Sequence, residues 1–201
     1  MQVDFYFDFS SPNAYLAHKL VPAMEQRTGV EITYQPALLG GIFNATNNKS
    51  PMETNAHVSN KIKYDQLEFD RFVKKSGATK FRFNPHFQLR TVFMMRAAIA
   101  EMHKGNLRAY VDAGMKIAWE DEVNVNDPAT TAAALSAAGF DGAALWEASQ
   151  TEAIKTELFE RTNTAVERGA FGMPTFFVGD EMFFGKDRMD QVEEEITKQS
   201  G

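Results

Sequence analysis

A strand that runs directly into a helix opens this chain, and the junction limits the possible folds more than any other feature. Residues 2–9 alternate Val or Phe with Gln, Asp or Tyr, which is the period of a β-strand. Ser11-Pro12 follows and is typical of a helix start, because serine is a favoured N-cap and proline loses no hydrogen bond there. The free N–H groups of the helix N-terminus and the Ser11 hydroxyl would then lie together, and both stabilise a bound anion. Taken alone, such a pair is more often only a cap.

The later elements predict an α/β fold of the thioredoxin type. Gly29 ends the first helix, and residues 30–34 alternate again, which completes a strand–helix–strand unit with parallel strands. Strand character returns only in the hairpin pattern of residues 175–184, which turns at Gly179-Asp180 and precedes a last helix over 187–198.

Between these parts, residues 51–168 have helical periodicity almost throughout. The order β-α-β, helices, β-β-α is that of a thioredoxin-like sheet with helices inserted at its crossover. We therefore expect a discontinuous thioredoxin-like domain of residues 1–50 and 169–201, with an inserted helical domain of residues 51–168.

Composition excludes several classes of function. The formal net charge of −6 argues against nucleic acid as the main partner, because binding phosphates needs a basic surface. The chain has no cysteine, which excludes disulfides, thiolate zinc sites and a cysteine nucleophile, and its four histidines lack ligand spacing, so we expect no metal. No apolar run has the length of a membrane span and no basic signal-peptide start is present, so we expect a cytoplasmic protein that does not bind membranes.

The loop before the hairpin, Gly172-Met173-Pro174-Thr175, is a second candidate site element. A proline directly before a hairpin strand and close to glycine is a candidate cis peptide. A cis bond would turn the Met173 N–H and C=O outward, where an extended peptide would pair with them as an added strand does. The alternative is a simple trans proline at a sheet edge, which blocks further pairing.

Four separated motifs together resemble one family, the 2-hydroxychromene-2-carboxylate isomerases. The resemblance covers nearly the whole chain in order and rests on residues 5–16, 40–51, 83–87, and 172–178 with 184–188. This family belongs with the kappa-class glutathione transferases to the DsbA-like branch of the thioredoxin superfamily.

The resemblance implies a glutathione site. Ser11 matches the family's catalytic serine, which replaces the first cysteine of the redox enzymes and hydrogen-bonds the glutathione sulfur. Asn48 matches an asparagine near the thiol and the substrate. Met173-Pro174 matches the loop that pairs with the cysteinyl backbone of glutathione, and Lys186-Asp187 falls where the family binds the γ-glutamyl end.

The substrate half of the site departs from the family pattern. Asn44 stands where lysine is usual, Asn47 where glycine is common, and residues 88–90 replace a more usual Pro-Val-Asn. We expect Phe9 and Phe43, with Phe87 and Trp119, to line an aromatic cavity, although core packing explains most aromatic residues at such spacing. Arg90 or Lys49 would hold a substrate carboxylate. The alternative is that each is a solvated surface charge, which is the better interpretation for Lys49.

The resemblance implies a glutathione-dependent isomerase that acts on 2-hydroxychromene-2-carboxylate or a similar aromatic carboxylate. A kappa-like glutathione transferase of general electrophiles needs the same thiolate, and a redox-inactive module that binds thiols or peptides also fits the absence of cysteine. Serine hydrolysis is disfavoured because no histidine base stands near Ser11 in the sequence. Relatives of this type are commonly dimers, so a homodimer remains open.

Overall fold

A four-stranded sheet lies at the centre of the computed structural model, which describes residues 1–200. Its order is β2-β1-β3-β4, and the strands are β1 (Val3–Phe7), β2 (Thr33–Pro36), β3 (Thr175–Val178) and β4 (Glu181–Phe184). Strand β1 pairs in parallel with β2 and antiparallel with β3, and β3 pairs antiparallel with β4. The parallel pair needs a crossover, which α1 (Pro12–Thr28) supplies. The predicted thioredoxin-like topology is therefore confirmed.

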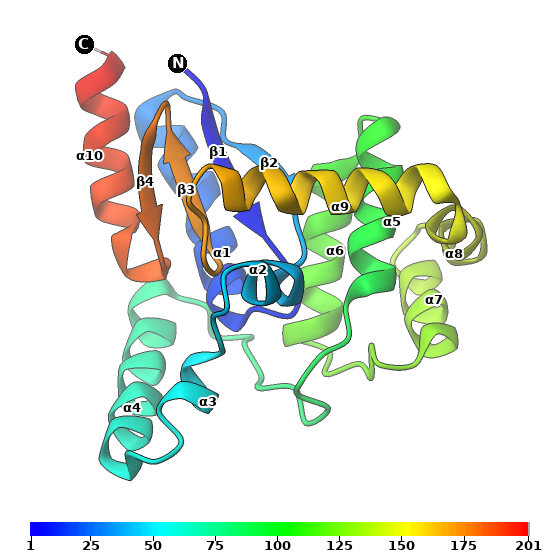
Figure 1. Ribbon diagram of the computed structural model, residues 1–201, viewed down its shortest axis with the longest axis horizontal. Coiled ribbons are helices and arrows are strands. Elements are labelled where there is room, and N and C mark those ends of the chain that lie inside the picture. Colours follow the sequence, from blue (N-terminus) through cyan, green and yellow to red (C-terminus); the bar gives the residue numbers. More distant parts are fainter. Residues whose placement is uncertain (201) are drawn as a thin grey trace.

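Helices occupy the chain between β2 and β3. They are α2 (Leu39–Ala45), α3 (Pro51–Thr54), α4 (Ser59–Ser76), α5 (Val92–His103), α6 (Leu107–Trp119), α7 (Pro128–Ala137), α8 (Gly142–Gln150) and α9 (Glu152–Glu167). Figure 1 shows α5, α6, α7 and α8 to one side of the sheet and α3 and α4 below it. The regular elements described within residues 51–168 are all helices, as expected. The division into two domains stays a prediction, and Gly201, which it includes, lies outside the described residues.

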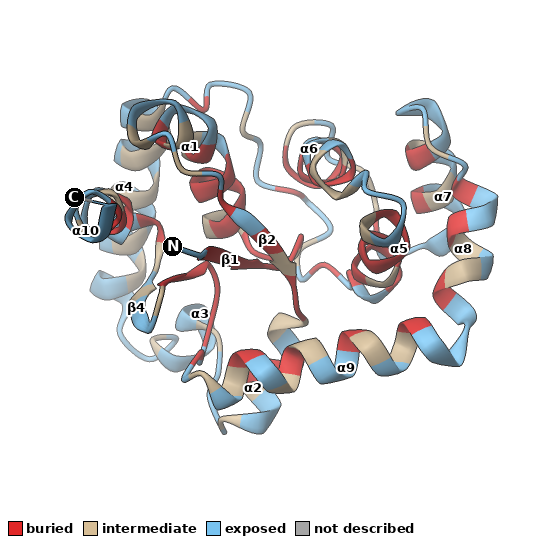
Figure 2. Ribbon diagram, turned by 90° about the horizontal axis from the view of Figure 1, so that it is seen from above, coloured by how far each residue is buried: buried red, intermediate tan, exposed pale blue. Residues whose placement is uncertain are grey.

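Helices cover both faces of the sheet. In Figure 2, α1 lies on one side of β1 and α2 and α9 lie on the other. Every residue of β1 is buried, so its alternating side chains enter two cores. Phe5 stacks on Phe176 with ring centroids 4.6 Å apart, whereas the neighbouring Tyr6 packs edge-on to Phe177 on the other face. The sequence alternation thus separates two helical layers and does not separate core from solvent.

Two predicted boundaries differ from the structure. Strand β2 begins at Thr33, whereas the alternation predicted residues 30–34. The reason is local: the Glu25 side chain accepts the Ile32 N–H at 2.9 Å, so this donor does not join the sheet. The last helix, α10 (Met189–Ser200), follows a short 3-10 turn (Lys186–Arg188), whereas one helix over 187–198 was predicted. Gly29 ends α1 in the left-handed conformation at φ 69°, as predicted.

His18 on α1 is buried between two polar partners. Its Nδ1 lies 2.7 Å from the Tyr34 hydroxyl and its Nε2 lies 2.9 Å from the Asp112 carboxylate. A neutral ring that donates from Nε2 and accepts at Nδ1 satisfies both contacts. Burial lowers the pKa of His18 below the ordinary value near 6.5, although Asp112 opposes the shift.

This lowered pKa predicts a pH-dependent stability. The unfolded chain binds a proton at His18 more readily than the folded chain does, so the free energy of unfolding should fall as the pH drops below about 6.5. His18→Gln should flatten this part of the pH profile in urea denaturation. The same substitution at exposed His57 is the control and should keep the wild-type slope. An unchanged slope in His18→Gln would contradict the assignment.

Candidate functional site

The hydroxyl of Ser11 joins two distant segments of the chain. Ser11 is the N-cap of α1, where its Oγ accepts the Ala14 N–H at 3.1 Å and Pro12 occupies the first turn, as predicted. The same Oγ donates to the Met173 carbonyl at 3.2 Å. The first turn of α1 carries no acidic residue, so no carboxylate there competes for its N–H groups. Ser11 itself is only 3% exposed.

The loop that carries Met173 has the predicted cis peptide bond at Met173-Pro174. Its other contacts hold it against the hairpin, because Gly185 donates to the Pro174 carbonyl at 2.9 Å and Thr175 Oγ1 donates to the Gly172 carbonyl at 2.8 Å. The Met173 carbonyl faces Ser11, which differs from the expectation that it would be free for an extended peptide. Among residues 1–200, none accepts the Met173 N–H, which is a backbone donor beside Ser11.

Asn48 reaches the same loop from the other side. Its Nδ2 donates to the Phe171 carbonyl at 2.8 Å, and its backbone N–H donates to the Phe43 carbonyl at 2.9 Å. Phe43 on α2 is half-buried, and Asn48 is exposed. The structure therefore brings Asn48 and Phe43 together beside the proline loop.

Asn47 has a left-handed backbone with φ 51°, a conformation that glycine adopts freely and asparagine tolerates better than most other residues. Asn47→Gly should change the free energy of unfolding by less than about 1 kcal/mol, whereas Asn47→Val should lower it by about 1–2 kcal/mol. Urea denaturation measures both changes. The same valine at Asn44, an exposed residue of α2, is the control, and equal effects at the two positions would refute the backbone argument.

Lys186 and Asp187 lie just beyond β4, after the glycine that bonds Pro174. Lys186 is unusual because it is 7% exposed, and its Nζ lies 4.4 Å from the ring centre of Phe72 on α4. The same Nζ donates to the Asp187 carboxylate at 2.7 Å, while Asp187 itself is exposed. The pair places one fixed positive and one accessible negative charge near the proline loop.

Phe9 and Arg90 are not part of this group. Phe9 is fully buried in the main core, where its ring packs on Gly114 and Tyr110 and its carbonyl accepts the Trp119 indole N–H at 2.8 Å. This corrects the expectation that Phe9 contacts a substrate: its side chain fills the space that the missing Gly114 side chain leaves. The Arg90 side chain is exposed, and its backbone N–H donates to Asn126 Oδ1 at 2.6 Å.

Sequence reasoning missed Asp8. This carboxylate is 1% exposed and accepts from the Ser10 N–H at 2.9 Å, the Leu39 N–H at 2.8 Å and the Thr91 hydroxyl at 2.5 Å. Burial raises the pKa of Asp8, and these hydrogen bonds oppose that effect. An acidic residue inside an aromatic run, two residues before Ser10, was the signal that could have identified it.

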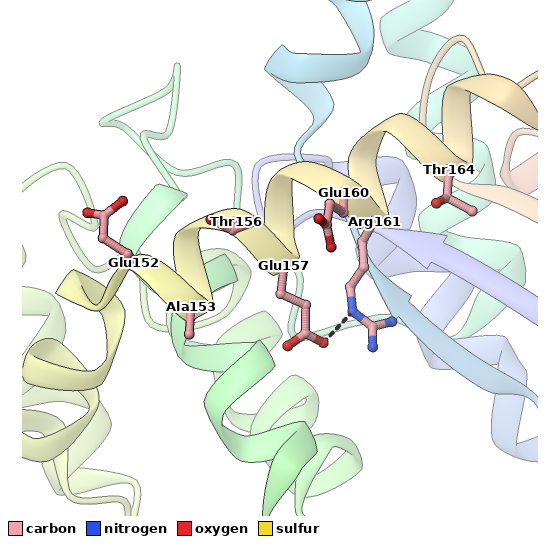
Figure 3. Close-up of a pocket in the computed structure, with 7 residues that line it drawn as sticks. All are labelled: Glu152, Ala153, Thr156, Glu157, Glu160, Arg161 and Thr164. Carbon is pink, nitrogen blue, oxygen red and sulfur yellow. Dashed lines mark hydrogen bonds and ion pairs between the residues drawn. The ribbon is translucent and has the colours of Figure 1, made fainter.

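Two surface grooves of the structure lie away from these residues. One runs along α9 and is lined by Glu152, Ala153, Thr156, Glu157, Glu160, Arg161 and Thr164 (Figure 3). A second is formed by α10. Neither includes a predicted site residue. Within residues 1–200, no helix has the length and apolar character needed to cross a membrane, and no three acidic or histidine side chains cluster as metal ligands.

Comparison with known proteins agrees with this geometry. The model of the DSBA-like thioredoxin domain family matches residues 2–197, so the chain belongs to that family. It is 31% identical over 191 residues to the 2-hydroxychromene-2-carboxylate isomerase of Sphingobium xenophagum, covering 95% of each chain. It is 27% identical to the glutathione S-transferase kappa 1 of Rattus norvegicus, covering 94% of this chain and 87% of the relative.

A solved 2-hydroxychromene-2-carboxylate isomerase superposes with a TM-score of 0.84 at 27% identity, covering 100% of this chain and 96% of the other. Within the DsbA-like family, the chain thus groups with the 2-hydroxychromene-2-carboxylate isomerases and the kappa-class glutathione transferases, which are enzymes.

Proposed function

We propose that this protein is a glutathione-dependent isomerase that acts on 2-hydroxychromene-2-carboxylate or a similar aromatic carboxylate. The observation that supports the proposal best is the position of the Ser11 hydroxyl, between the α1 N-terminus and the Met173 loop. Its close relatives at 30% identity or more are named for that isomerase reaction.

The residues around Ser11 fit glutathione. The Met173 N–H has no acceptor among the described residues, and in this proposal it donates to the cysteinyl carbonyl of an extended tripeptide. The exposed Asp187 carboxylate fits an α-ammonium group, and Asn48 offers a polar side chain on the opposite side of the loop. When bound, glutathione would supply a thiolate nucleophile that adds to a conjugated carbon of the substrate and later leaves it.

Ser11 contributes by favouring the anion. Its hydroxyl rotates from the Met173 carbonyl and donates to sulfur, without itself ionising. A free thiol has a pKa of about 8.5, and a hydrogen bond to a charged group contributes about 1.5–3 kcal/mol. At about 1.4 kcal/mol per pKa unit, this bond lowers the thiol pKa by roughly one to two units. The α1 N-terminus adds a smaller contribution.

The test is a titration of glutathione bound to the wild-type protein, followed by the ultraviolet absorbance of the thiolate. We expect the pKa of the bound thiol to lie about one to two units below that of free glutathione. Isothermal titration calorimetry establishes in the same samples that the tripeptide binds. A bound thiol with an ordinary pKa would favour the redox-inactive binding module, and absence of binding would refute both readings.

A glutathione transferase of the kappa type is the second candidate, because a kappa-class transferase matches almost the whole chain. The two reactions differ in whether they consume glutathione. An isomerase forms and then breaks the carbon–sulfur bond, so glutathione is regenerated, whereas a transferase consumes one glutathione for each electrophile. Free thiol measured before and after turnover separates them, first with a chromene carboxylate and then with chlorodinitrobenzene.

Location and assembly complete the proposal. We infer a cytoplasmic protein, since glutathione is abundant in that compartment, and leave the homodimer as a hypothesis. Cell fractionation and sedimentation equilibrium test these two statements.

A further inference from the structure

One buried carboxylate connects the three segments that surround Ser11. Asp8 Oδ1 accepts from the Ser10 N–H and from the Thr91 hydroxyl, and Oδ2 accepts from the Leu39 N–H. Ser10 precedes the cap of α1, Leu39 is the first residue of α2, and Thr91 directly precedes α5. The backbone carbonyl of Asp8 also accepts the Ser11 N–H at 3.1 Å.

Burial of the Asp8 carboxylate costs more folding free energy than a contact with only a structural role would justify. A carboxylate that is 1% exposed loses nearly all of its hydration, and all three donors to it are neutral groups. No cation among residues 1–200 forms an ion pair with it. Desolvation of this kind raises the pKa of Asp8, so the hydrogen bonds only partly offset the burial.

Each bond of Asp8 ends at a segment that carries a different part of the proposed site. The Ser10 bond fixes the turn before Ser11. The Leu39 bond fixes the start of α2, which holds Phe43 and leads to Asn48. The Thr91 bond fixes the end of the segment 83–91, whose Phe83 and Phe87 rings lie 5.0 Å apart beside Trp119.

We propose that Asp8 is a positioning residue that holds the glutathione side of the site, on α1 and α2, in register with the aromatic segment 83–91 on the substrate side. This inference rests on the proposed function. Asp8 touches neither sulfur nor substrate. It acts through the positions of Ser11, Asn48 and the segment 83–91.

Two substitutions distinguish the bond from Asp8 to Thr91 from its bonds to Ser10 and Leu39. Thr91→Val removes only the hydroxyl bond at nearly constant volume. It should raise the KM for 2-hydroxychromene-2-carboxylate about tenfold, while the Kd for glutathione changes less than about twofold. Asp8→Asn turns an amide NH2 toward the Leu39 N–H or toward Ser10 and Thr91. It should therefore weaken glutathione binding about tenfold as well.

Matched variants distinguish positioning from loss of stability. Thr131 is buried and its hydroxyl donates to the Asp127 carbonyl at 2.9 Å, away from the site. Thr131→Val should lower the melting temperature and leave the Kd and the KM unchanged. Thr91→Ser keeps the hydroxyl and should restore the wild-type KM.

The measurements are calorimetry for the glutathione Kd, thiolate absorbance, melting temperature, and kinetics with 2-hydroxychromene-2-carboxylate well below the melting transition. Failure of the wild-type protein to bind glutathione would overturn the proposed function and the role of Asp8 with it. Binding by the wild-type protein, with Thr91→Val and Asp8→Asn behaving like Thr131→Val, would overturn the role of Asp8 alone.

Discussion

Replacement of Ser11 by alanine should raise the pKa of bound glutathione by about one to two units and lower turnover at neutral pH about ten- to thirtyfold. The physical reason is that alanine removes the O–H that donates to the sulfur anion, while the α1 N-terminus remains. Thiolate absorbance during a pH titration and the kcat at saturating glutathione measure the two effects. Calorimetry should still detect binding, because the Met173 loop and the region around Asp187 are unchanged.

The alanine variant also loses a helix cap, so its stability needs a control. The lost Ala14 bond costs about 1 kcal/mol of folding free energy. Asp141→Ala removes the equivalent bond to Ala144 at the N-cap of α8, away from the site, and should lower stability similarly while keeping wild-type turnover. Unchanged thiol pKa and unchanged turnover in Ser11→Ala would remove Ser11 from the mechanism.

Phe9→Ala should lower the free energy of unfolding by about 3–5 kcal/mol, a large share of the 5–15 kcal/mol typical of a domain. The ring is 0% exposed and lies so close to Gly114 that a side-chain carbon added there would sit 2.4 Å from it. The cavity left by alanine therefore opens inside the main core. Chemical denaturation measures the loss.

Phe159 on α9 provides the matched control because it is 62% exposed, and Phe159→Ala should change stability by less than about 0.5 kcal/mol. A Phe9→Ala protein that keeps wild-type stability and loses only substrate affinity would show that Phe9 lines a substrate cavity after all.

Local signals predicted the parts of the fold that depend on neighbouring residues. The cap at Ser11 with proline behind it, the left-handed Gly29, and the hairpin at Gly179 all follow from backbone preferences of single residues, and the structure contains each of them. The predicted start of β2 was wrong because the side chain of Glu25, on α1, accepts the hydrogen bond of the Ile32 N–H. No periodicity in residues 30–34 contains that information.

The site was predictable only in part, for the same reason. Met173 could be placed beside Ser11, and Asn48 beside the loop that carries Met173, because the motifs around them resemble a family. Spacing alone would not join segments so far apart. Phe9 alternates correctly for a strand, but alternation does not say whether a ring meets solvent or a second helical layer. Asp8 was missed because two of its three donors, the Leu39 N–H and the Thr91 hydroxyl, come from segments that only the tertiary fold brings to it.

The bond from Ser11 to the Met173 carbonyl has a consequence for ligand choice. A hydroxyl has a single proton, so it can serve either the carbonyl or an incoming sulfur, never both. A neutral thiol is a weaker hydrogen-bond acceptor than a peptide carbonyl, so the Ser11 hydroxyl keeps its bond to the Met173 carbonyl. A thiolate anion accepts a hydrogen bond about twice as strong as a neutral acceptor does, so the hydroxyl rotates toward it. In the proposed complex, the Ser11 hydroxyl would therefore leave the Met173 carbonyl for a bound thiolate and would stay on this carbonyl when the bound thiol is protonated.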